Sequence, residues 1–545
     1  PSGRIGIRTG RWTLTASGSG SFTPVAESRF TETREQAGQP LPFAGRSDSK
    51  SRTNYGRGHF SAVFDPTPKH TAGFDIEYTE RSTHMPTLSR TTLGQTQSDS
   101  RYRQHMDGNT LTATANYIWK IDTLGSQFKL IADYTRYTSD GDNSYHTTTC
   151  APGTLRDSLY ESTTGSVYDI LTADAGLTRK LPHGLTLRAG LRYTRNDMAD
   201  KSRYAAQTQG TWLALPEYSY DQHYTEQIGA AYASLEYSAG RWELSAGLRG
   251  EYTSVASQAF GRSYFGLFPN VSVSRALNAL RTWLLVAQWS RNIERPAFPA
   301  LNPARIRISD YSWQSGNPSL RPTYIHRFSL TAVWKYRYTL TVGGNLHHDL
   351  IREIAHRDAT APDAVYIRPE NHYTENHWFV AASVPAKITR WWNLSVNAVG
   401  VMQRIRLNST DSPATHYLMF ADATCSFTLP AGFFAEAVYR AQSRLYSGNS
   451  EVGPRHTLSA TVKKQLFGKR LTLFCTLSNI TGCDWEFASL TDGMRRTIDT
   501  GQAWSGRLWK VGAAWNFRTG KKFRARTVES AAETQRKRLV KSTEQ

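Results

Sequence analysis

The chain has no long hydrophobic run. Among its 545 residues no apolar stretch approaches the ~18 residues that a membrane-spanning helix requires, and the mean hydropathy is −0.51. These absences exclude a helical membrane protein. They do not exclude a β-barrel, because a barrel strand turns only every second residue toward lipid.

Cysteine is scarce as well. The four cysteines form no CxxC pair, so a structural zinc site is not expected. Cys425 and Cys475 fall within strand patterns, while Cys150 and Cys483 fall in polar loops. A Cys150–Cys483 disulfide would require two distant loops to meet, and free thiols are at least an equal alternative. The cysteines therefore predict no disulfide framework.

Recognisable catalytic and metal-binding patterns are missing too. No serine or cysteine lies in a nucleophile elbow, so we predict no catalytic residues and no enzyme. His347 and His348 are adjacent on a predicted strand and would point to opposite faces, which prevents joint chelation. The run 140–143 resembles a calcium loop but lacks the glycine and glutamate that complete one, so a solvated turn is expected. We predict no metal site and no cofactor.

Acidic residues are outnumbered, with 65 Lys and Arg against 45 Asp and Glu and a formal charge of +20. In a soluble protein this charge would suggest nucleic acid. Here it is spread over loops and polar strand faces, without a recognition helix or a stacking motif, so we expect no nucleic-acid partner. Basic residues concentrate in 518–545, for which we predict a periplasmic tail that is disordered or partly helical. Contact of this tail with acidic lipid headgroups or a periplasmic partner is the alternative.

What the chain does contain is an alternating pattern, repeated about ten times. The clearest copy places Leu185, Leu187, Ala189, Leu191 and Tyr193 on one strand face and Thr186, Arg188, Gly190, Arg192 and Thr194 on the other. Short connections rich in Gly, Pro, Asn and Asp alternate with long polar ones. We therefore predict an all-β fold: an antiparallel transmembrane β-barrel with short periplasmic turns and long extracellular loops. A soluble β-sandwich would explain any single strand equally well.

Aromatic residues gather at two levels along these strands. One group lies beside the short connections: Trp119, Tyr237, Trp242, Trp334, Tyr336, Trp391 and Trp392. A second group follows such a connection by roughly seven to eleven residues, about the length of a strand tilted across a bilayer. Its members are Tyr78, Tyr134, Tyr193, Tyr252 and Tyr439. Rings at both interfaces of outer-membrane lipid explain the two levels better than a sandwich does.

The pattern gives about 21 strands, and the last of them, at 506–517, leads from a long loop toward the short-turn side. The C-terminus is therefore predicted to be periplasmic, and the barrel to span 1–517. Single-chain bacterial barrels have an even strand number, so we expect about 22 strands, with one missing before Pro1. Because the chain starts at Pro1 without a signal peptide, we interpret it as part of a longer precursor or as a processed form.

Several segments carry a family likeness. They are Phe268-Pro269-Asn270-Val271-Ser272, Ser290-Arg291-Asn292-Ile293-Glu294-Arg295-Pro296, Leu301-Asn302-Pro303, Gly316-Asn317-Pro318-Ser319-Leu320-Arg321-Pro322 and Leu477-Ser478-Asn479-Ile480-Thr481. This series resembles the barrel portion of TonB-dependent outer-membrane receptors, most closely the outer-membrane β-barrel family common in Bacteroidetes. The motif positions are Asn302, Pro303, Gly316, Asn317, Pro318 and Pro322. Pro318 and Pro322 fix φ and remove donors, so this loop would enter its strand in one register.

The resemblance implies an outer-membrane receptor that takes up a nutrient, either a glycan, a peptide or a chelated metal. It also implies a plug domain in front of the barrel, a TonB-type energy complex and the barrel-assembly machinery. That machinery would recognise the aromatic-ended last strand through Trp515 and Phe517. The sequence contains no recognisable plug or energy-coupling box, so a passive pore or a surface-binding barrel without energised import is the alternative function.

Two predicted loops offer aromatic platforms for a ligand. Trp212, Tyr218 and Tyr220 cluster in one loop, and Tyr311 and Trp313 in another. Aromatic faces suit sugar rings or other flat apolar ligands, which makes these five residues candidate ligand contacts. Packing anchors that hold the loops together are the alternative interpretation.

Overall fold

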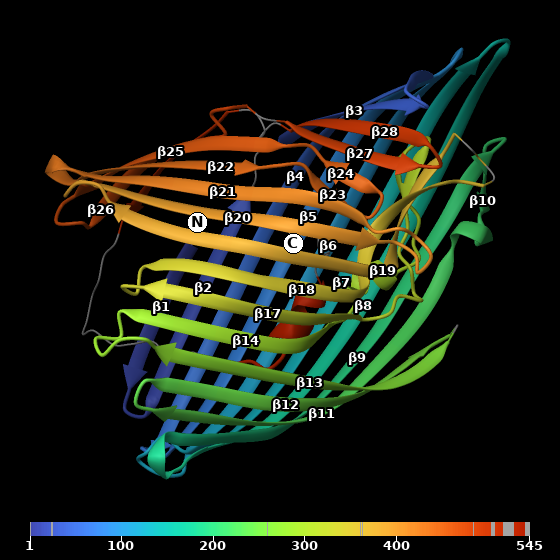
Figure 1. Cartoon of the computed structure of the whole chain (residues 1–545). Coiled ribbons are helices and arrows are strands. Elements are labelled where there is room, and N and C mark those ends of the chain that lie inside the picture. Colours follow the sequence, from blue (N-terminus) through green and yellow to red (C-terminus); the bar gives the residue numbers. More distant parts are fainter. Residues whose placement is uncertain are drawn as a thin grey trace.

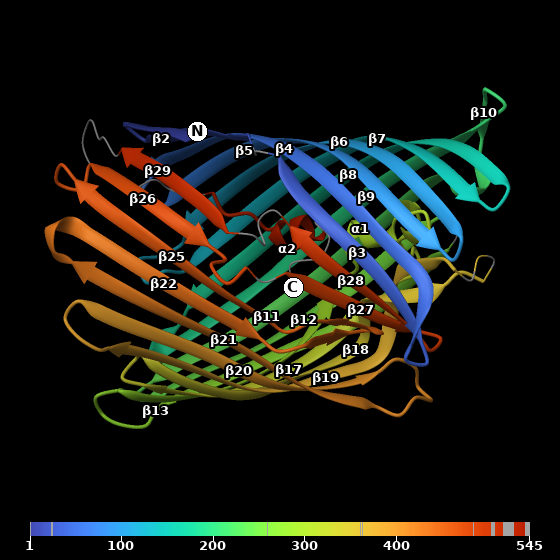
Figure 2. The same ribbon diagram turned by 90° about the horizontal axis from the view of Figure 1, so that it is seen from above.

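A computed structural model describes residues 2–22, 25–258, 260–359, 361, 363–482, 484–502, 507–515 and 528–539. Almost all of them belong to one largely antiparallel sheet, in which 29 strands are defined. The sheet curls into a barrel of tilted strands (Figure 1). Turned by 90°, the strands again run at a slant, and two short helices are visible between them (Figure 2). The predicted antiparallel β-barrel is therefore confirmed.

The barrel wall is built by strands that pair in chain order through antiparallel ladders. They are β1 (Ser2–Thr9), β2 (Trp12–Phe22), β4 (Gln39–Thr67), β5 (His70–Leu93), β6 (Thr96–Lys120), β7 (Gln127–Ala151), β8 (Thr154–Lys180), β9 (Leu185–Thr208), β11 (Tyr220–Ala239), β12 (Trp242–Ser257), β13 (Gly261–Ala276), β14 (Trp283–Glu294), β17 (Thr323–Trp334), β18 (Tyr338–Arg357), β19 (Val365–Lys387), β20 (Trp392–Arg406), β21 (Ala414–Leu429), β22 (Phe433–Gln442), β25 (Arg455–Leu466), β26 (Leu471–Ser478) and β29 (Leu508–Trp515). Within the described residues no ladder joins β29 to β1, which leaves a seam in the wall. The total strand number stays a prediction.

The wall reverses the burial pattern of a soluble protein. Leu191 and Phe265 are each 64% exposed on the outer face, whereas the polar Asn196 and Thr253 are 0% exposed on the luminal face. Soluble proteins bury most aliphatic and aromatic side chains and expose polar ones. An apolar outer face of this kind fits a hydrocarbon environment and argues against the soluble sandwich.

Aromatic rings pack together beside the short turns, as the two-belt pattern predicts for one end of the barrel. Trp283 stacks on Trp334 with ring centroids 5.7 Å apart, and Trp392 stacks on Phe427 at 6.0 Å. Trp283 and Trp334 remain exposed on the outer face. Rings in this position suit the boundary between hydrocarbon and headgroups. Two of the short connections are the 3-10 turns η1 (Pro182–Gly184) and η3 (Pro430–Gly432).

Two of the predicted long loops are strand extensions instead. β5 and β6 continue through 84–108 to a turn at Gly94, and β7 and β8 continue in the same way through 139–165. Polar side chains pair across these extensions, as where the hydroxyls of Ser100 and Thr147 lie 2.9 Å apart. Both faces are polar here, so there is no hydrophobic period to signal a strand.

A branch of the same sheet, the cap sheet, lies at the long-hairpin end of the barrel. β3 (Ala26–Gln36) pairs with β4 and with β28 (Met494–Gln502), which continues through β27 (Trp485–Thr491) to β24 (Ser450–Val452) and β23 (Leu445–Ser447). The buried Glu32 on β3 ties this cap together, because its carboxylate lies 2.8 Å from Arg34 and 2.7 Å from Arg496. Arg496 also donates to Ser312 Oγ at 3.0 Å.

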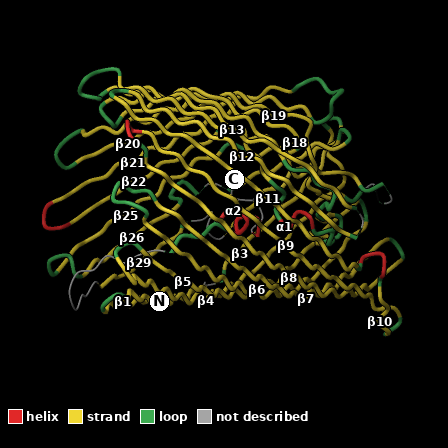
Figure 3. The backbone as a smooth tube through the Cα atoms, turned by 90° about the horizontal axis from the view of Figure 1, so that it is seen from below, coloured by secondary structure: helices red, strands yellow, loops and turns green. Residues whose placement is uncertain are grey.

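Two stretches of chain lie within the barrel (Figure 3). The luminal insert, 295–322, contains α1 (Phe298–Leu301), β15 (Ile306–Ser309) and β16 (Ser312–Gln314) and packs Phe298, Leu301 and Leu320 against the wall. The luminal segment, 528–539, contains α2 (Glu533–Arg536) and η4 (Lys537–Leu539). None of the helices in the described part of the chain has the length and hydropathy needed to cross a membrane.

The luminal segment is part of the predicted tail 518–545, whose periplasmic location stays a prediction. Residues 528–539 contact the luminal face of the barrel. The physical reason is charge complementarity, because basic groups of the segment meet carboxylates of the wall such as Glu226. The remaining tail residues lie outside the described residues.

Candidate functional site

The family-motif residues build the luminal insert. Asn302 Oδ1 accepts hydrogen bonds from the Tyr220 hydroxyl at 2.6 Å and from the Ala304 amide at 2.9 Å. The Gly316 amide donates to the Asn302 carbonyl at 2.9 Å, so the insert folds back on the end of α1. A Cβ atom on Gly316 would lie 2.1 Å from that carbonyl oxygen, which explains why glycine stands there. Pro303, the next motif residue after Asn302, is half-buried.

The second half of the motif fastens the insert to neighbouring strands. Asn317 Nδ2 donates to the Pro369 carbonyl at 3.0 Å, and Asn317 Oδ1 accepts from the Ser319 amide at 3.1 Å. Pro318 follows within this turn, and Pro322 is buried directly before β17. In this structure the motif residues therefore act as scaffold for the insert.

The aromatic candidates from the two loops are partly brought together. The Arg305 guanidinium lies 5.2 Å from the ring centroid of Tyr218 and 5.3 Å from that of Trp313, so one cation joins both loops. Tyr218 belongs to η2 (Pro216–Tyr218) and Trp313 to β16. Both rings are only partly covered, and their role as ligand contacts stays a prediction.

The other three aromatic candidates lie apart from this pair. Tyr220 is anchored by its hydrogen bond to Asn302, which favours the packing interpretation for this residue. The Tyr311 ring meets Phe43 edge-on with centroids 5.8 Å apart, below the cap. Trp212 on β10 (Thr211–Ala214), at the tip of the β9 hairpin, is 40% exposed.

A buried ion-pair cluster on β11 and β12 forms the most enclosed polar site in the lumen. Glu226 and Glu251 face it from the wall, Arg295 from the insert and Arg538 from the luminal segment. Arg295 lies 2.7 Å from Glu251, and Arg538 lies 2.5 Å from Glu226. Burial acts against the charge on Arg295, but nearby Tyr264, Glu251 and Glu226 together raise its pKa above the ordinary value.

A second cluster surrounds Glu375 on β19. Its buried carboxylate lies 2.8 Å from His377 Nε2 and 3.0 Å from an Arg352 guanidinium nitrogen. His347 bonds to the Glu375 carbonyl, whereas His348 turns to Asp349, so the two adjacent histidines diverge. In the part of the chain that the structure describes, no group of three His, Cys, Asp or Glu side chains is arranged to hold a metal ion.

Asp310 at the tip of the insert anchors it to the wall. Its carboxylate accepts from the Tyr102 hydroxyl at 2.8 Å and from Arg307 at 2.7 Å. Burial opposes the charge on Arg307, but Asp310 raises the pKa of its guanidinium. The Arg307–Asp310 ion pair lies within the insert, and the wall holds the insert through neutral hydroxyls such as that of Tyr102, which donate to the Asp310 carboxylate.

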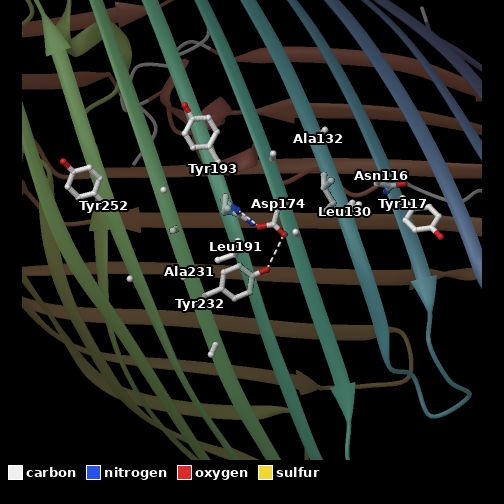
Figure 4. Close-up of a pocket in the computed structure, with 18 of the residues that line it drawn as sticks. Asn116, Tyr117, Leu130, Ala132, Asp174, Leu191, Tyr193, Ala231, Tyr232 and Tyr252 are labelled. Carbon is white, nitrogen blue, oxygen red and sulfur yellow. Dashed lines mark hydrogen bonds and ion pairs between the residues drawn. The ribbon is translucent and has the colours of Figure 1, made fainter.

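A large hollow lies on the outside of the barrel. It measures about 1250 Å³, and its lining from β6 to β13 includes Tyr117, Tyr193 and Tyr252 (Figure 4). On the luminal side of the same strands, Asp174 pairs with Arg192 at 2.8 Å. Because exposed apolar side chains line the hollow, it is a surface for the bilayer and not a solute site.

The structure describes only some of the residues of the predicted C-terminal assembly signal and only some of the cysteines. Trp515 ends β29 and is exposed on the outer face, 6.0 Å from Phe467 between ring centroids, while Phe517 lies outside the described residues. Cys150, Cys425 and Cys475 are free thiols. Cys483 lies outside the described residues, and the free thiol of Cys150 agrees with the alternative that these cysteines are not bridged.

Sequence reasoning missed the Glu226–Arg538 pair entirely. Glu226 sits within an ordinary alternating strand, and Arg538 lies in a basic stretch that shows no hydrophobic period. The two residues are 312 positions apart, so no local signal connects them. Of the charged residues in this cluster, only Arg295 belongs to a segment that carries the family likeness, where it precedes Pro296.

A comparison with sequence families finds a β-barrel family, in agreement with the observed fold. The model of the outer membrane protein β-barrel family matches residues 119–512. The chain belongs to this family. Its location is therefore the bacterial outer membrane, in agreement with the apolar outer face of the wall. No curated protein sequence matches the chain.

Solved structures share the architecture at low sequence identity. The ferric-catecholate import receptor Fiu from K12 E. coli is 9% identical, with a TM-score of 0.51. The match covers 88% of this chain and 81% of that chain. The FpvAI–pyocin S2 complex is 11% identical at a TM-score of 0.51, with coverages of 88% and 70%. The siderophore receptor PirA from Pseudomonas aeruginosa is 12% identical at 0.46, with coverages of 88% and 80%. The first two show a shared fold, and the third adds no argument.

Proposed function

We propose that this barrel is an outer-membrane receptor that imports a nutrient through its lumen with energy from a TonB-type inner-membrane complex. The observation that supports this most is the folded chain inside the lumen, where Phe298, Leu301 and Leu320 of the insert are almost completely buried. A passive porin keeps an aqueous channel through its barrel. A lumen occupied by folded chain instead requires a rearrangement for each solute that passes. The passive pore is therefore the less favoured alternative.

In this proposal the short turns and the end of β29 face the periplasm, and the hairpin extensions face the outside. A plug domain carried by the full-length protein would meet the energy complex on the periplasmic side. The barrel-assembly machinery would insert the barrel through its last strand. Nutrient capture would begin at the hairpin end, where Tyr218, Arg305 and Trp313 present two aromatic faces and a cation.

The nutrient class is a glycan, a peptide or a chelated metal. Fiu is described as an import receptor for ferric catecholates, which keeps chelated metal among the three. At the identity observed, that likeness does not select one class for this chain.

Growth and uptake experiments test the proposal. A strain lacking the gene is grown with a glycan, a short peptide or a chelated metal as the limiting nutrient, and the gene is restored in cells with and without the energy complex. We expect a growth defect on one nutrient class and rescue only in cells that contain the complex. Rescue without the complex would identify a passive pore. Nutrient binding to cells without any growth defect would identify a surface-binding barrel.

A further inference from the structure

The luminal segment places one arginine side chain in a closed pocket. Arg538 Nη1 donates to Glu226 Oε2 at 2.5 Å, and Arg538 Nε donates to the Pro296 carbonyl at 3.0 Å. The guanidinium lies over the Phe298 ring, 4.2 Å from its centroid. A carboxylate, a carbonyl and an aromatic face are the three partners that a planar guanidinium uses best. The pocket is therefore complementary to arginine in shape, charge and hydrogen bonding.

The other nearby cations leave Glu226 to this arginine. Arg295 and Arg249 both contact Glu251, at 2.7 and 2.6 Å. The distance from Arg295 Nε to Glu226 Oε1 is 3.9 Å, beyond hydrogen-bonding range. Glu226 is 2% exposed and also accepts a hydrogen bond from Asn196 Nδ2 at 2.8 Å, so among the described residues Arg538 is the cation within hydrogen-bonding range of this buried carboxylate. The pocket is thus organised to receive a positive charge from a third source.

The surroundings of the pocket bind the segment as a peptide. The Ala531 amide donates to Asp133 Oδ2 at 2.7 Å, and Asn196 Nδ2 donates to Gln535 Oε1 at 3.3 Å. Asn196 is fully buried, and its Oδ1 has no hydrogen-bond partner among the described residues. That oxygen offers one more acceptor for an N–H group. A backbone amide and an arginine side chain are groups that an incoming peptide also carries.

We propose that the pocket formed by Glu226, Phe298 and the Pro296 carbonyl is a binding site for the arginine side chain of a peptide, and that the luminal segment occupies it as an internal competitor. This inference rests on the proposed function, because it selects a basic peptide from the three nutrient classes. Lysine offers a point charge without the planar fork, so it is a poorer ligand. Citrulline keeps the shape of arginine but leaves the buried carboxylate without a counter-charge.

Peptide binding to the purified full chain in detergent tests the proposal. The probe is a fluorescein-labelled peptide with the sequence of 528–539, and anisotropy reports binding to wild type and to Arg538→Ala. We expect Arg538→Ala to bind the probe at least about tenfold more tightly, because the internal competitor has lost its anchor. The matched control is Lys537→Ala, which removes an exposed cation from the neighbouring position and is expected to leave affinity within about twofold of wild type.

Changing the probe keeps the test independent of how barrel variants fold. Peptides with lysine or citrulline at the position of Arg538 are expected to bind Arg538→Ala at least about tenfold more weakly than the arginine probe. Glu226→Gln is expected to lower affinity for the arginine probe in the same way. Equal binding of the arginine and citrulline probes, or no binding to a folded Arg538→Ala barrel, overturns the proposal. Because binding in detergent needs no energy complex, this result is separate from the outcome of the uptake experiments.

Discussion

Replacing Phe298 by alanine should release the luminal insert without unfolding the barrel. The ring is 0% exposed, meets Tyr168 edge-on at 5.7 Å and packs with Leu301 and Leu320. Removing a buried phenylalanine ring costs about 3–5 kcal/mol. The cost falls on the insert, because the wall ladders do not include this residue. The equilibrium for local opening of the insert should therefore rise roughly 150- to 5000-fold.

Trypsin cleavage measures this opening. Arg305 lies within the insert, and cleavage after it becomes possible whenever the insert detaches, so its rate follows the opening equilibrium. The denaturant midpoint of the barrel should hardly move. Trp212→Ala serves as the control, because it removes a large aromatic side chain from the exposed hairpin tip and should leave the cleavage rate unchanged. An unchanged rate for Phe298→Ala, or a drop in barrel stability of the same size, would refute the view of the insert as a separate unit.

Three further predictions concern the insert and the orientation of the barrel. Gly316→Ala should strongly speed tryptic cleavage of the insert, because the added Cβ would lie 2.1 Å from a backbone oxygen. Gly400→Ala, where the added Cβ meets open space, should leave the rate unchanged, and equal rates for the two variants would contradict the packing. Tyr220→Phe removes the hydroxyl bonded to Asn302 and should weaken closure of the insert by about 1 kcal/mol, measured as a several-fold faster cleavage, and a wild-type rate would show that the bond contributes nothing. Cys150 is an exposed free thiol near a hairpin tip, so in a Cys483→Ser background a membrane-impermeant maleimide should label intact cells, and the further change Cys150→Ser should abolish this labelling. Labelling only after lysis would reverse the proposed orientation.

Much of the wall was predictable from its sequence. The alternation around 185–194 predicts strand β9 and also the face that meets lipid, on which Leu191 and Tyr193 are exposed. This works because a strand has a period of two and the bilayer selects one face along its whole length. The hairpin extensions escaped prediction because polar side chains occupy both of their faces, with the Ser100–Thr147 pair on one face and the Arg90–Asp99 pair on the other.

The interior was much less predictable. The motif around Asn302 and Gly316 drew attention to the insert, but the reason for it, a chain reversal inside the lumen, depends on contacts with Tyr220 from another strand. The position of Arg538 in the lumen depends on a carboxylate 312 residues away. Charge in a tail reveals affinity for acidic groups, but not where those groups are located.

The cap sheet determines the order in which the barrel can be completed. Glu32 and Arg496 are 464 residues apart, yet they form a buried ion pair next to the β3–β28 ladder. Contacts at such separation form late in folding, because the intervening chain must be in place first. The first and last parts of the wall would therefore stay apart in an assembly intermediate, as the two edges of a curled sheet. Within the described residues, the β3–β28 ladder is the pairing that joins these two edges into a ring.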